Sequence, residues 1–289
     1  MTLVRYEVLL TVSRLKSFTK AAEELNMTQS GVSHAIKSLE DELGFPLITR
    51  NKRGITPTSE GKMLLNYINE IIQLERKIKQ EVDKVHGIET GEIRIGSFSS
   101  VTSLWLPHIF YEFQKDYPNV RLILYEGVYK EIEEMLLNGE IDCGFIVAPV
   151  SKELEYIHLK NDPLVCIVSK SHELSNEEKI TIEQLEKEQF IVPQEGGDLD
   201  VVKTFNKYNI RPEIKFKVIE NQTILSLVEK GLGISIIAKM VLDSNSADIR
   251  ALKLEDNLYR SIIIATNKYI SPLTEKFIEY VVRFVKNQM

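Results

Sequence analysis

From Gly91 onward, short apolar runs alternate with longer segments of helical periodicity, and this alternation restricts the chain to few folds. The runs are GEIRIGS, VRLILYE, IDCGFIV, PLVCIVS, FIVPQ, EIKFKVIE, GISIIA and RSIIIATN, with helices expected near 100–116, 128–138, 181–188, 199–207, 222–230 and 272–287. This order predicts an α/β fold in which parallel sheets carry helices on both faces. Because 91–289 is long for one sheet, we expect two subdomains with a cleft between them: subdomain I about 91–161 and 266–289, and subdomain II about 162–265.

Residues 1–58 lack this alternation and predict a small, mainly helical head. Helices are expected over 3–15, 18–25 and about 29–43, and the segment FPLITRNKRGITPT predicts two short strands around Gly54. Capping residues mark the helix ends: Ser17 and Thr28 precede the second and third helices, and Gly44 follows the third. Helix, helix, turn, helix and β-ribbon in this order predict a winged helix-turn-helix domain.

Residues 59–88 predict one long helix with an apolar stripe at alternating spacings of three and four residues. Such a stripe, interrupted at Glu75, is typical of a coiled-coil seam about three heptads long. The seam is formed by Leu64, Ile68, Ile71, Ile78, Val82 and Val85. The stripe could pack on its own domain or on a second copy of the chain. We favour a dimerising linker helix, because the segment bridges two compositionally different parts.

Composition and charge argue against several classes of protein. No run of about 18 uninterrupted apolar residues occurs, so no membrane-spanning helix is expected. The first residues do not resemble a signal peptide, since Arg5, Glu7, Arg14 and Lys16 interrupt the apolar positions, and we expect a cytoplasmic protein. The net charge of −6 argues against nucleic acid at first sight. The placement of charge matters more than its sum, however.

The head carries residues suited to binding DNA. Ala21 and Ala22 are small where two helices of a helix-turn-helix must cross closely. The exposed face of the third helix would carry short polar side chains and one base, which suit the edges of base pairs in the major groove: Gln29, Ser30, Ser33, His34 and Lys37. Basic side chains on the wing would reach phosphates or the minor groove: Arg50, Lys52 and Arg53.

The spacing of these residues resembles that of the LysR-type transcriptional regulators. That family's hallmark is S-F-x-x-A-A-x-x-L, then S/T-Q-x-x-[VL]-S, L-E-x-x-L-G-x-x-L-[FI]-x-R and T-x-x-G. The matching residues are Ser17-Phe18, Ala21-Ala22, Leu25, Thr28-Gln29, Val32-Ser33, Leu39-Glu40, Leu43-Gly44, Leu47-Ile48, Arg50, Thr58 and Gly61. The chain departs from the family in having His34 where Arg is frequent and Ser30 where Pro is frequent. Because histidine, unlike arginine, is not a permanently charged residue type, this departure bears on the DNA sequence preference.

The resemblance implies how the DNA contacts would be divided. Gln29, Ser33 and His34 would face base edges, and Lys37 would reach a base or a phosphate. Contacts that position the DNA backbone would come from Thr28, Ser30, Arg50 and Arg53. The family also implies a homodimer or homotetramer on an inverted-repeat promoter site in double-stranded DNA, with RNA polymerase as a further candidate partner.

The resemblance further implies that 91–289 is an effector-binding domain of periplasmic-binding-protein-like fold. Where GEIRIGS meets the next helix, hydroxyls and backbone N–H groups would form a site for a carboxylate or other anion: Ser99, Ser100 and Thr102. Other crossover ends should converge on the cleft: Phe145, Val147, Gly196, Asn221 and Thr223. The expected effector is a small, anionic metabolite, although the sequence places no arginine securely in the cleft.

Three other functions fit the sequence less well. An enzyme is disfavoured because the five histidines are scattered and no Walker A or G-x-S-x-G motif occurs, so no catalytic residue, metal or cofactor is expected. A solute-binding protein for transport would need export. A redox sensor would depend on Cys143 and Cys166, which we interpret as small buried residues of two strands.

Overall fold

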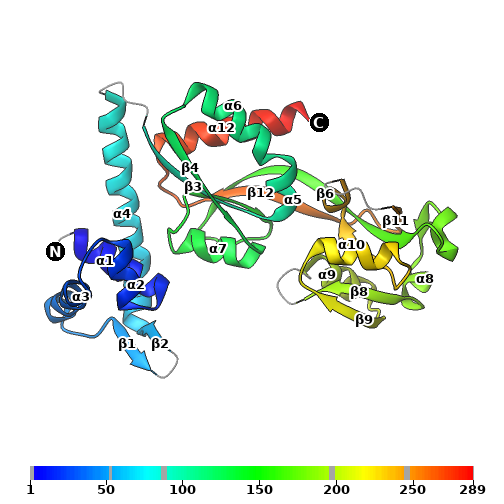
Figure 1. Ribbon diagram of the computed structural model, residues 1–289, viewed down its shortest axis with the longest axis horizontal. Coiled ribbons are helices and arrows are strands. Elements are labelled where there is room, and N and C mark those ends of the chain that lie inside the picture. Colours follow the sequence, from blue (N-terminus) through cyan, green and yellow to red (C-terminus); the bar gives the residue numbers. More distant parts are fainter. Residues whose placement is uncertain (1–2, 52–53, 86–89, 195–198, 244–247, 289) are drawn as a thin grey trace.

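The computed structural model describes residues 3–51, 54–85, 90–194, 199–243 and 248–288 (Figure 1). A head of short helices and a β-ribbon packs on the first half of a long helix, α4 (Ser59–Val85). A two-lobed α/β region follows α4 in the chain. Across the described residues, no helix combines the length and the apolar character needed to cross a membrane.

The head contains the helices and the β-ribbon that the sequence predicts. Ser17 Oγ accepts a hydrogen bond from Lys20 N at 3.3 Å, and Thr28 Oγ1 accepts one from Gly31 N at 3.0 Å. Both residues therefore cap the helices that they precede. Gly44 ends the third helix at a φ of 81°, which glycine adopts without strain. The elements are α1 Leu3–Leu15, α2 Phe18–Glu24, α3 Gln29–Leu43, β1 Ile48–Asn51 and β2 Gly54–Pro57.

Hydrogen bonds attach the wing to the end of α3, and attach the start of α4 to Leu47, the residue that precedes β1. Glu40 Oε1 accepts hydrogen bonds from the backbone N–H groups of Leu47 at 2.7 Å and Ile48 at 3.1 Å. Thr58 N donates to Leu47 O at 2.9 Å, and the Thr58 hydroxyl accepts from Gly61 N at 2.9 Å. A Cβ atom at Gly61 would lie 2.2 Å from Leu47 O, so this close approach requires glycine. The first turn of α4 is thus fixed directly on the wing.

The apolar stripe of α4 is divided between two environments, whereas the sequence favours a single dimerisation seam interrupted at Glu75. Leu64 and Ile68 pack into the core of the head, and Ile68 is only 4% exposed, so it is not presented to a second chain. The reason is that α1 packs against this part of α4. Val85 ends the helix, and its side chain lies outside the described part. Among the α4 side chains that the structure describes, the large apolar ones that are exposed are Met63, Tyr67, Ile71, Leu74, Ile78 and Val82.

The α/β region alternates strands and helices broadly as the sequence predicts. Its strands are β3 Gly91–Ser97, β4 Val120–Glu126, β5 Cys143–Val147, β6 Glu155–Ser169, β7 Lys179–Ile180, β8 Gln189–Pro193, β9 Glu213–Val218, β10 Ser235–Ala238, β11 Ile249–Leu254 and β12 Tyr259–Thr266. Its helices are α5 Ser99–Leu104, α6 Leu106–Asp116, α7 Tyr129–Leu137, α8 Ile182–Glu186, α9 Leu199–Tyr208, α10 Asn221–Glu229, α11 Lys239–Asp243 and α12 Pro272–Asn287, with a 3-10 turn at Glu173–Asn176. The sequence pattern does not predict β7, β11 or α11.

The larger sheet of the α/β region is mixed, which corrects the expectation of parallel sheets. β3 is parallel to both β4 and β5, and β8 is parallel to β9. The strands β6 and β12 instead run antiparallel to each other, and β12 is also antiparallel to β5. The larger sheet has the order β4-β3-β5-β12-β6-β11-β7, with β10 also paired to β6. The two antiparallel strands therefore connect the two lobes.

Each lobe has its own hydrophobic core. The first core contains buried residues between Ile93 and Leu159 together with α12, and the second lies between Leu164 and Leu254. The apolar residues of β12 from 262 to 265 belong to the first core. The chain therefore re-enters the first lobe slightly before residue 266, where the sequence pattern places the boundary. Met240 of α11 also lies in the first core, and α11 packs against α5.

We predict that Gly61→Ala destabilises the head selectively. The added methyl group would overlap Leu47 O, and shifting the backbone to relieve such overpacking costs about 1–3 kcal/mol. Thermal unfolding of the full-length protein should therefore show an earlier transition for the head. Lys62→Ala, at an exposed position of the same helical turn, is the matched control. Equal stability of the two variants would contradict the close approach.

Candidate functional sites

The first candidate site is the exposed face of α3. The opposite side of this helix fills the core of the head through Val32, Ala35, Ile36 and Leu39. The residues that the sequence predicts for DNA contact lie together on the remaining surface: Thr28, Gln29, Ser30, His34 and Lys37 are exposed, and Ser33 is half-buried. A helix with short polar side chains along its first turns fits the major groove of DNA.

The N-terminus of α3 and the wing flank this face. Thr28 Oγ1 and Ser30 Oγ lie 3.1 Å apart, so one hydroxyl donates to the other at the end of the helix where backbone N–H groups favour a phosphate. On the wing, Arg50 lies in β1 opposite Ile55, but its side chain is outside the described part. Arg53 also falls outside the described residues.

The second candidate site is the junction where β6 and β12 pass between the lobes. Arg260 of β12 and Asp162 of β6 are direct cross-strand neighbours. Nη2 and Nε of Arg260 lie 2.7 and 2.8 Å from Asp162 Oδ2, and the two side chains are 4% and 1% exposed. A buried ion pair of this kind is tolerated only when its remaining polar atoms are also hydrogen-bonded.

The other donors of Arg260 reach the first lobe. Nη1 donates to Tyr129 OH at 2.6 Å, and Nη2 donates to Ser100 Oγ at 2.8 Å. The guanidinium carbon also lies 4.9 Å from the centre of the Phe98 ring, a favourable cation–π contact. On the other side, Asp162 Oδ1 accepts from a backbone N–H of α11 at 3.1 Å. These residues, Arg260, Asp162, Ser100, Tyr129 and Phe98, form what we call the Arg260 cluster. The cluster connects α5, α7, α11 and both crossing strands.

Sequence reasoning missed Arg260. It placed no arginine in the cleft, whereas the structure places Arg260 against Ser100, one of the predicted effector residues. The available signal was weak, because Arg260 and Asp162 are merely the first residues of two largely apolar segments, RSIIIAT and DPLVCIVS. The antiparallel register that pairs them joins residues 98 positions apart and follows from no local pattern.

The three predicted hydroxyls at the start of α5 differ in their surroundings. Ser99 is exposed, and Ser100 is buried with its hydroxyl accepting from Arg260. Thr102 Oγ1 is buried without a hydrogen-bond partner among the described residues. A buried, unsatisfied hydroxyl is destabilising. Thr102 therefore carries a buried hydroxyl whose hydrogen-bonding capacity is unused within the described part of the chain.

The other predicted effector residues lie in different places. Val147 is half-buried at the end of β5, beside β12. Phe145 is fully buried in the first core, so its side chain is not presented to a cleft, and this part of the prediction is corrected. Asn221 and Thr223 lie in the first turn of α10 in the second lobe. Gly196 falls outside the described residues.

The cysteines give no support to the redox alternative. Cys143 and Cys166 are buried free thiols that belong to different hydrophobic cores. Burial raises the pKa of both thiols well above the usual value, which disfavours the reactive thiolate. They therefore act as small apolar residues. In the part of the chain that is described, no group of three or more His, Cys, Asp or Glu side chains is arranged to hold a metal ion.

Comparison with known proteins assigns the family. Residues 3–62 match the profile described as "Bacterial regulatory helix-turn-helix protein, lysR family", and residues 86–286 match the "LysR substrate binding domain". The chain belongs to the LysR family of transcriptional regulators, which is not an enzyme family. YvbU of Bacillus subtilis (strain 168), an uncharacterized HTH-type transcriptional regulator, is 33% identical over 268 residues, covering 92% of this chain and 91% of that protein.

Solved structures of regulators share the fold. A full-length OxyR variant from Pseudomonas aeruginosa matches with a TM-score of 0.80 at 21% identity, covering 99% of this chain and 95% of that one. Full-length CbnR complexed with its target DNA matches with a TM-score of 0.57 at 22% identity, covering 99% and 100%. The regulatory domain of Synechocystis PCC6803 CcmR in complex with 2-PG matches with a TM-score of 0.64 at 24% identity, covering 68% and 99%. The predicted fold class is thereby confirmed.

We predict that Arg260→Met destabilises the α/β region by about 3–5 kcal/mol, because it leaves the Asp162 carboxylate buried without its counter-ion. The control is Lys276→Met, which removes a cation from the exposed pair with Glu279 and should leave the free energy of unfolding nearly unchanged, because water screens such a pair. Urea unfolding of both variants measures the difference. A similar loss of unfolding free energy in the two variants would mean that the buried ion pair does not stabilise the junction between the lobes.

Proposed function

We propose that the chain is a sequence-specific DNA-binding transcriptional regulator controlled by a small anionic metabolite bound between its two lobes. The observation that carries the proposal is the exposed polar face of α3, on a head that α4 joins to a two-lobed α/β region. Family membership supports both halves of the proposal. A regulator of a bacterial chromosome would act in the cytoplasm, where that DNA lies.

On DNA, Gln29, Ser33 and His34 would read base edges in the major groove, and Lys37 would reach a base or a phosphate. Backbone contacts would come from the N-terminus of α3 and from the wing: Thr28, Ser30, Arg50 and Arg53. The exposure of the α3 residues supports these roles, as does the likeness to CbnR complexed with its target DNA.

The effector would bind at the junction beside Arg260. A guanidinium only donates hydrogen bonds, so the Ser100 oxygen accepts from Arg260 and its proton remains for a ligand acceptor. Together with the hydroxyls of Ser99 and Thr102, the Ser100 hydroxyl would donate hydrogen bonds to a carboxylate or a phosphate. Candidate contacts elsewhere around the cleft are Val147, Gly196, Asn221 and Thr223. The complex of the CcmR regulatory domain with 2-PG supports a small-molecule site in a domain of this fold.

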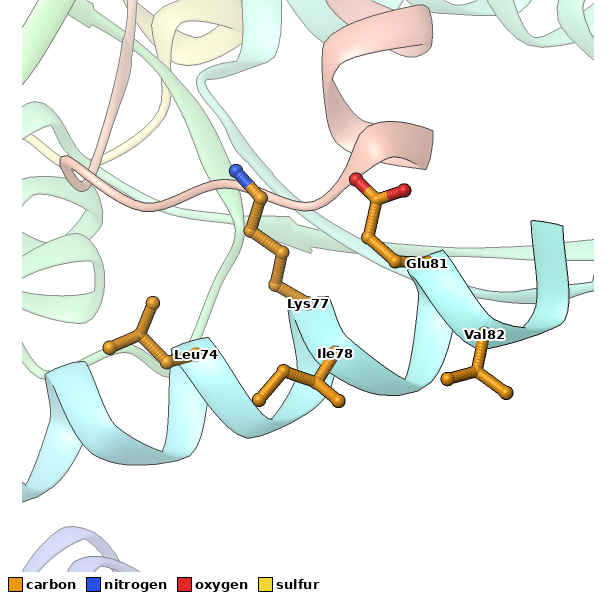
Figure 2. Close-up of a pocket in the computed structure, with 5 residues that line it drawn as sticks. All are labelled: Leu74, Lys77, Ile78, Glu81 and Val82. Atoms are coloured by element: carbon orange, nitrogen blue, oxygen red, sulfur yellow. The ribbon is translucent and has the colours of Figure 1, made fainter. Parts of the chain in front are cut away.

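A homodimer or homotetramer would form through the exposed apolar residues of α4. In Figure 2, Ile78 and Val82 project from the side of the helix opposite to Lys77 and Glu81. Ile71 and Leu74 continue this surface, whereas Leu64 and Ile68 of the predicted seam pack into the head. The side chain of Val85, the last residue of the predicted seam, lies outside the described part. Two heads related by symmetry would fit an inverted repeat in a promoter, where RNA polymerase is a further candidate partner.

Regulation would follow from unequal binding to two arrangements of the protein. An effector that binds one arrangement of the lobes more tightly shifts the population toward it. If that arrangement spaces the heads differently, DNA binding changes with it.

Selection of DNA from a random pool by the full-length protein, at two salt concentrations, tests the proposal. We expect an enriched inverted repeat with half-sites about one helical turn or more apart. Gln29→Ala should relax the preference at one base position and cost about 1–3 kcal/mol, whereas Lys37→Ala, if Lys37 binds a phosphate, should weaken binding to all sequences alike and lower its salt dependence. Absence of DNA binding at both salts would overturn the proposal.

Thr102→Val tests the effector site. Because Thr102 Oγ1 has no partner among the described residues, the isosteric change should leave the unliganded protein equally stable or slightly more stable. In a thermal-shift screen of small carboxylates and phosphates, the wild-type protein should be stabilised by a hit, and the variant should lose most of that shift. Ser103→Ala, an exposed position on the same helix, is the control. An unchanged shift in Thr102→Val would exclude Thr102 from the site.

A further inference from the structure

The turn that follows α7 is held by side chains of α4, which belongs to the other half of the chain. Asn69 Nδ2 donates to Leu137 O at 3.3 Å, and Gln73 Nε2 donates to Gly139 O at 3.4 Å. Asn69 and Gln73 are 5% and 8% exposed, although amide side chains on a long helix usually face water. Since the last carbonyls of a helix lack partners within it, Asn69 supplies a cap for α7 from outside its own domain.

Gly139 makes this approach sterically possible. It has a φ of 66°, and a Cβ atom built on it would lie 1.7 Å from Asn69 Oδ1. A side chain at this position would therefore displace the Asn69 amide from the turn. Asn267 Nδ2 donates to Leu136 O at 2.7 Å, so the end of α7 is fixed from two sides.

Charged groups from the head, from α4 and from the turn itself lie around the same turn. Burial lowers the pKa of Arg76 on α4, which interacts with Asp142 just after the turn. Burial also raises the pKa of Glu140, which interacts with Arg14 and Glu24 of the head. The turn, α4 and the head thus share one set of charges of both signs.

The first residue of α7 lies at the junction between the lobes. Tyr129 OH accepts a hydrogen bond from Arg260 Nη1 at 2.6 Å. The helix runs from Tyr129 to Leu137, a length of about 13 Å. A short, regular helix therefore contacts the Arg260 cluster with its first turn and α4 with its last. In Figure 1, α7 lies on the side of the α/β region nearest to α4.

We infer that α7 is a mechanical link, which docks on Asn69 and Gln73 and transmits the arrangement of the Arg260 cluster to α4 and the head. The alternative is that the head and the α/β region move independently. The idea that effector binding is the event transmitted through this link rests on the proposed function. The docking itself belongs to the unliganded chain and is tested without DNA or effector.

The docking is tested by Asn69→Asp in the unliganded full-length protein, with Asn66→Asp as the matched control. Aspartate presents an oxygen to Leu137 O and has no N–H to donate. Asn66 is exposed on the same helix, so the same change there should be tolerated. Hydrogen–deuterium exchange of residues 135–142 should be about tenfold faster in Asn69→Asp, as expected when a buried hydrogen bond becomes a repulsive contact. Equal exchange in the two variants would overturn the inference.

Transmission is tested by Tyr129→Phe, a conservative change that should not prevent folding. If α7 is a link, exchange of the α4 amides at 66–76 should rise severalfold, although these residues belong to another part of the chain. Tyr111→Phe, at an exposed position on α6, should leave them unchanged. Should Tyr129→Phe affect only residues near 129, the link is overturned. Failure of the DNA selection would instead overturn the proposed function and leave these exchange results intact.

Discussion

The ion pair between Arg260 and Asp162 is the interaction on which the arrangement of the α/β region depends. It joins the two antiparallel strands that run between the lobes, and each charge is buried. Taking both charges out of water is expensive, so the pair requires its further hydrogen bonds to Ser100, Tyr129 and the backbone of α11. Those obligatory partners lie on different elements, and satisfying the charges therefore fixes α5, α7 and α11 relative to the crossing strands.

Helix α4 meets three different surroundings. Ile68 is buried in the head, Asn69 and Gln73 are buried against the α/β region, and Ile78 and Val82 are exposed. A helix is stiff over this length, so these contacts cannot change independently. In our proposals, the exposed stretch pairs with a second chain and the buried amides receive the signal from α7, which makes α4 the element where assembly, sensing and DNA binding meet.

Local chemistry explains which parts of the structure were predictable. The caps Ser17 and Thr28 and the left-handed Gly44 act within a few residues, and each stands where the sequence predicts a helix end. The polar face of α3 followed equally from helical periodicity. Other features depend on distant parts of the chain. The pairing of Arg260 with Asp162 and the docking of Asn69 and Gln73 join residues 66 or more positions apart, and Ile68 is buried because α1 packs on α4. Periodicity carries no information about such contacts.

The separate burial of the two cysteines gives the chain a pair of built-in reporters. Cys143 lies in the core of one lobe and Cys166 in the core of the other, and burial keeps both thiols protonated and shielded. A thiol reagent can modify each one only after its own core has opened, at a rate set by the free energy of that opening. Labelling kinetics read at the two positions would thus separate the local stabilities of the lobes in the native protein, with no engineered probe.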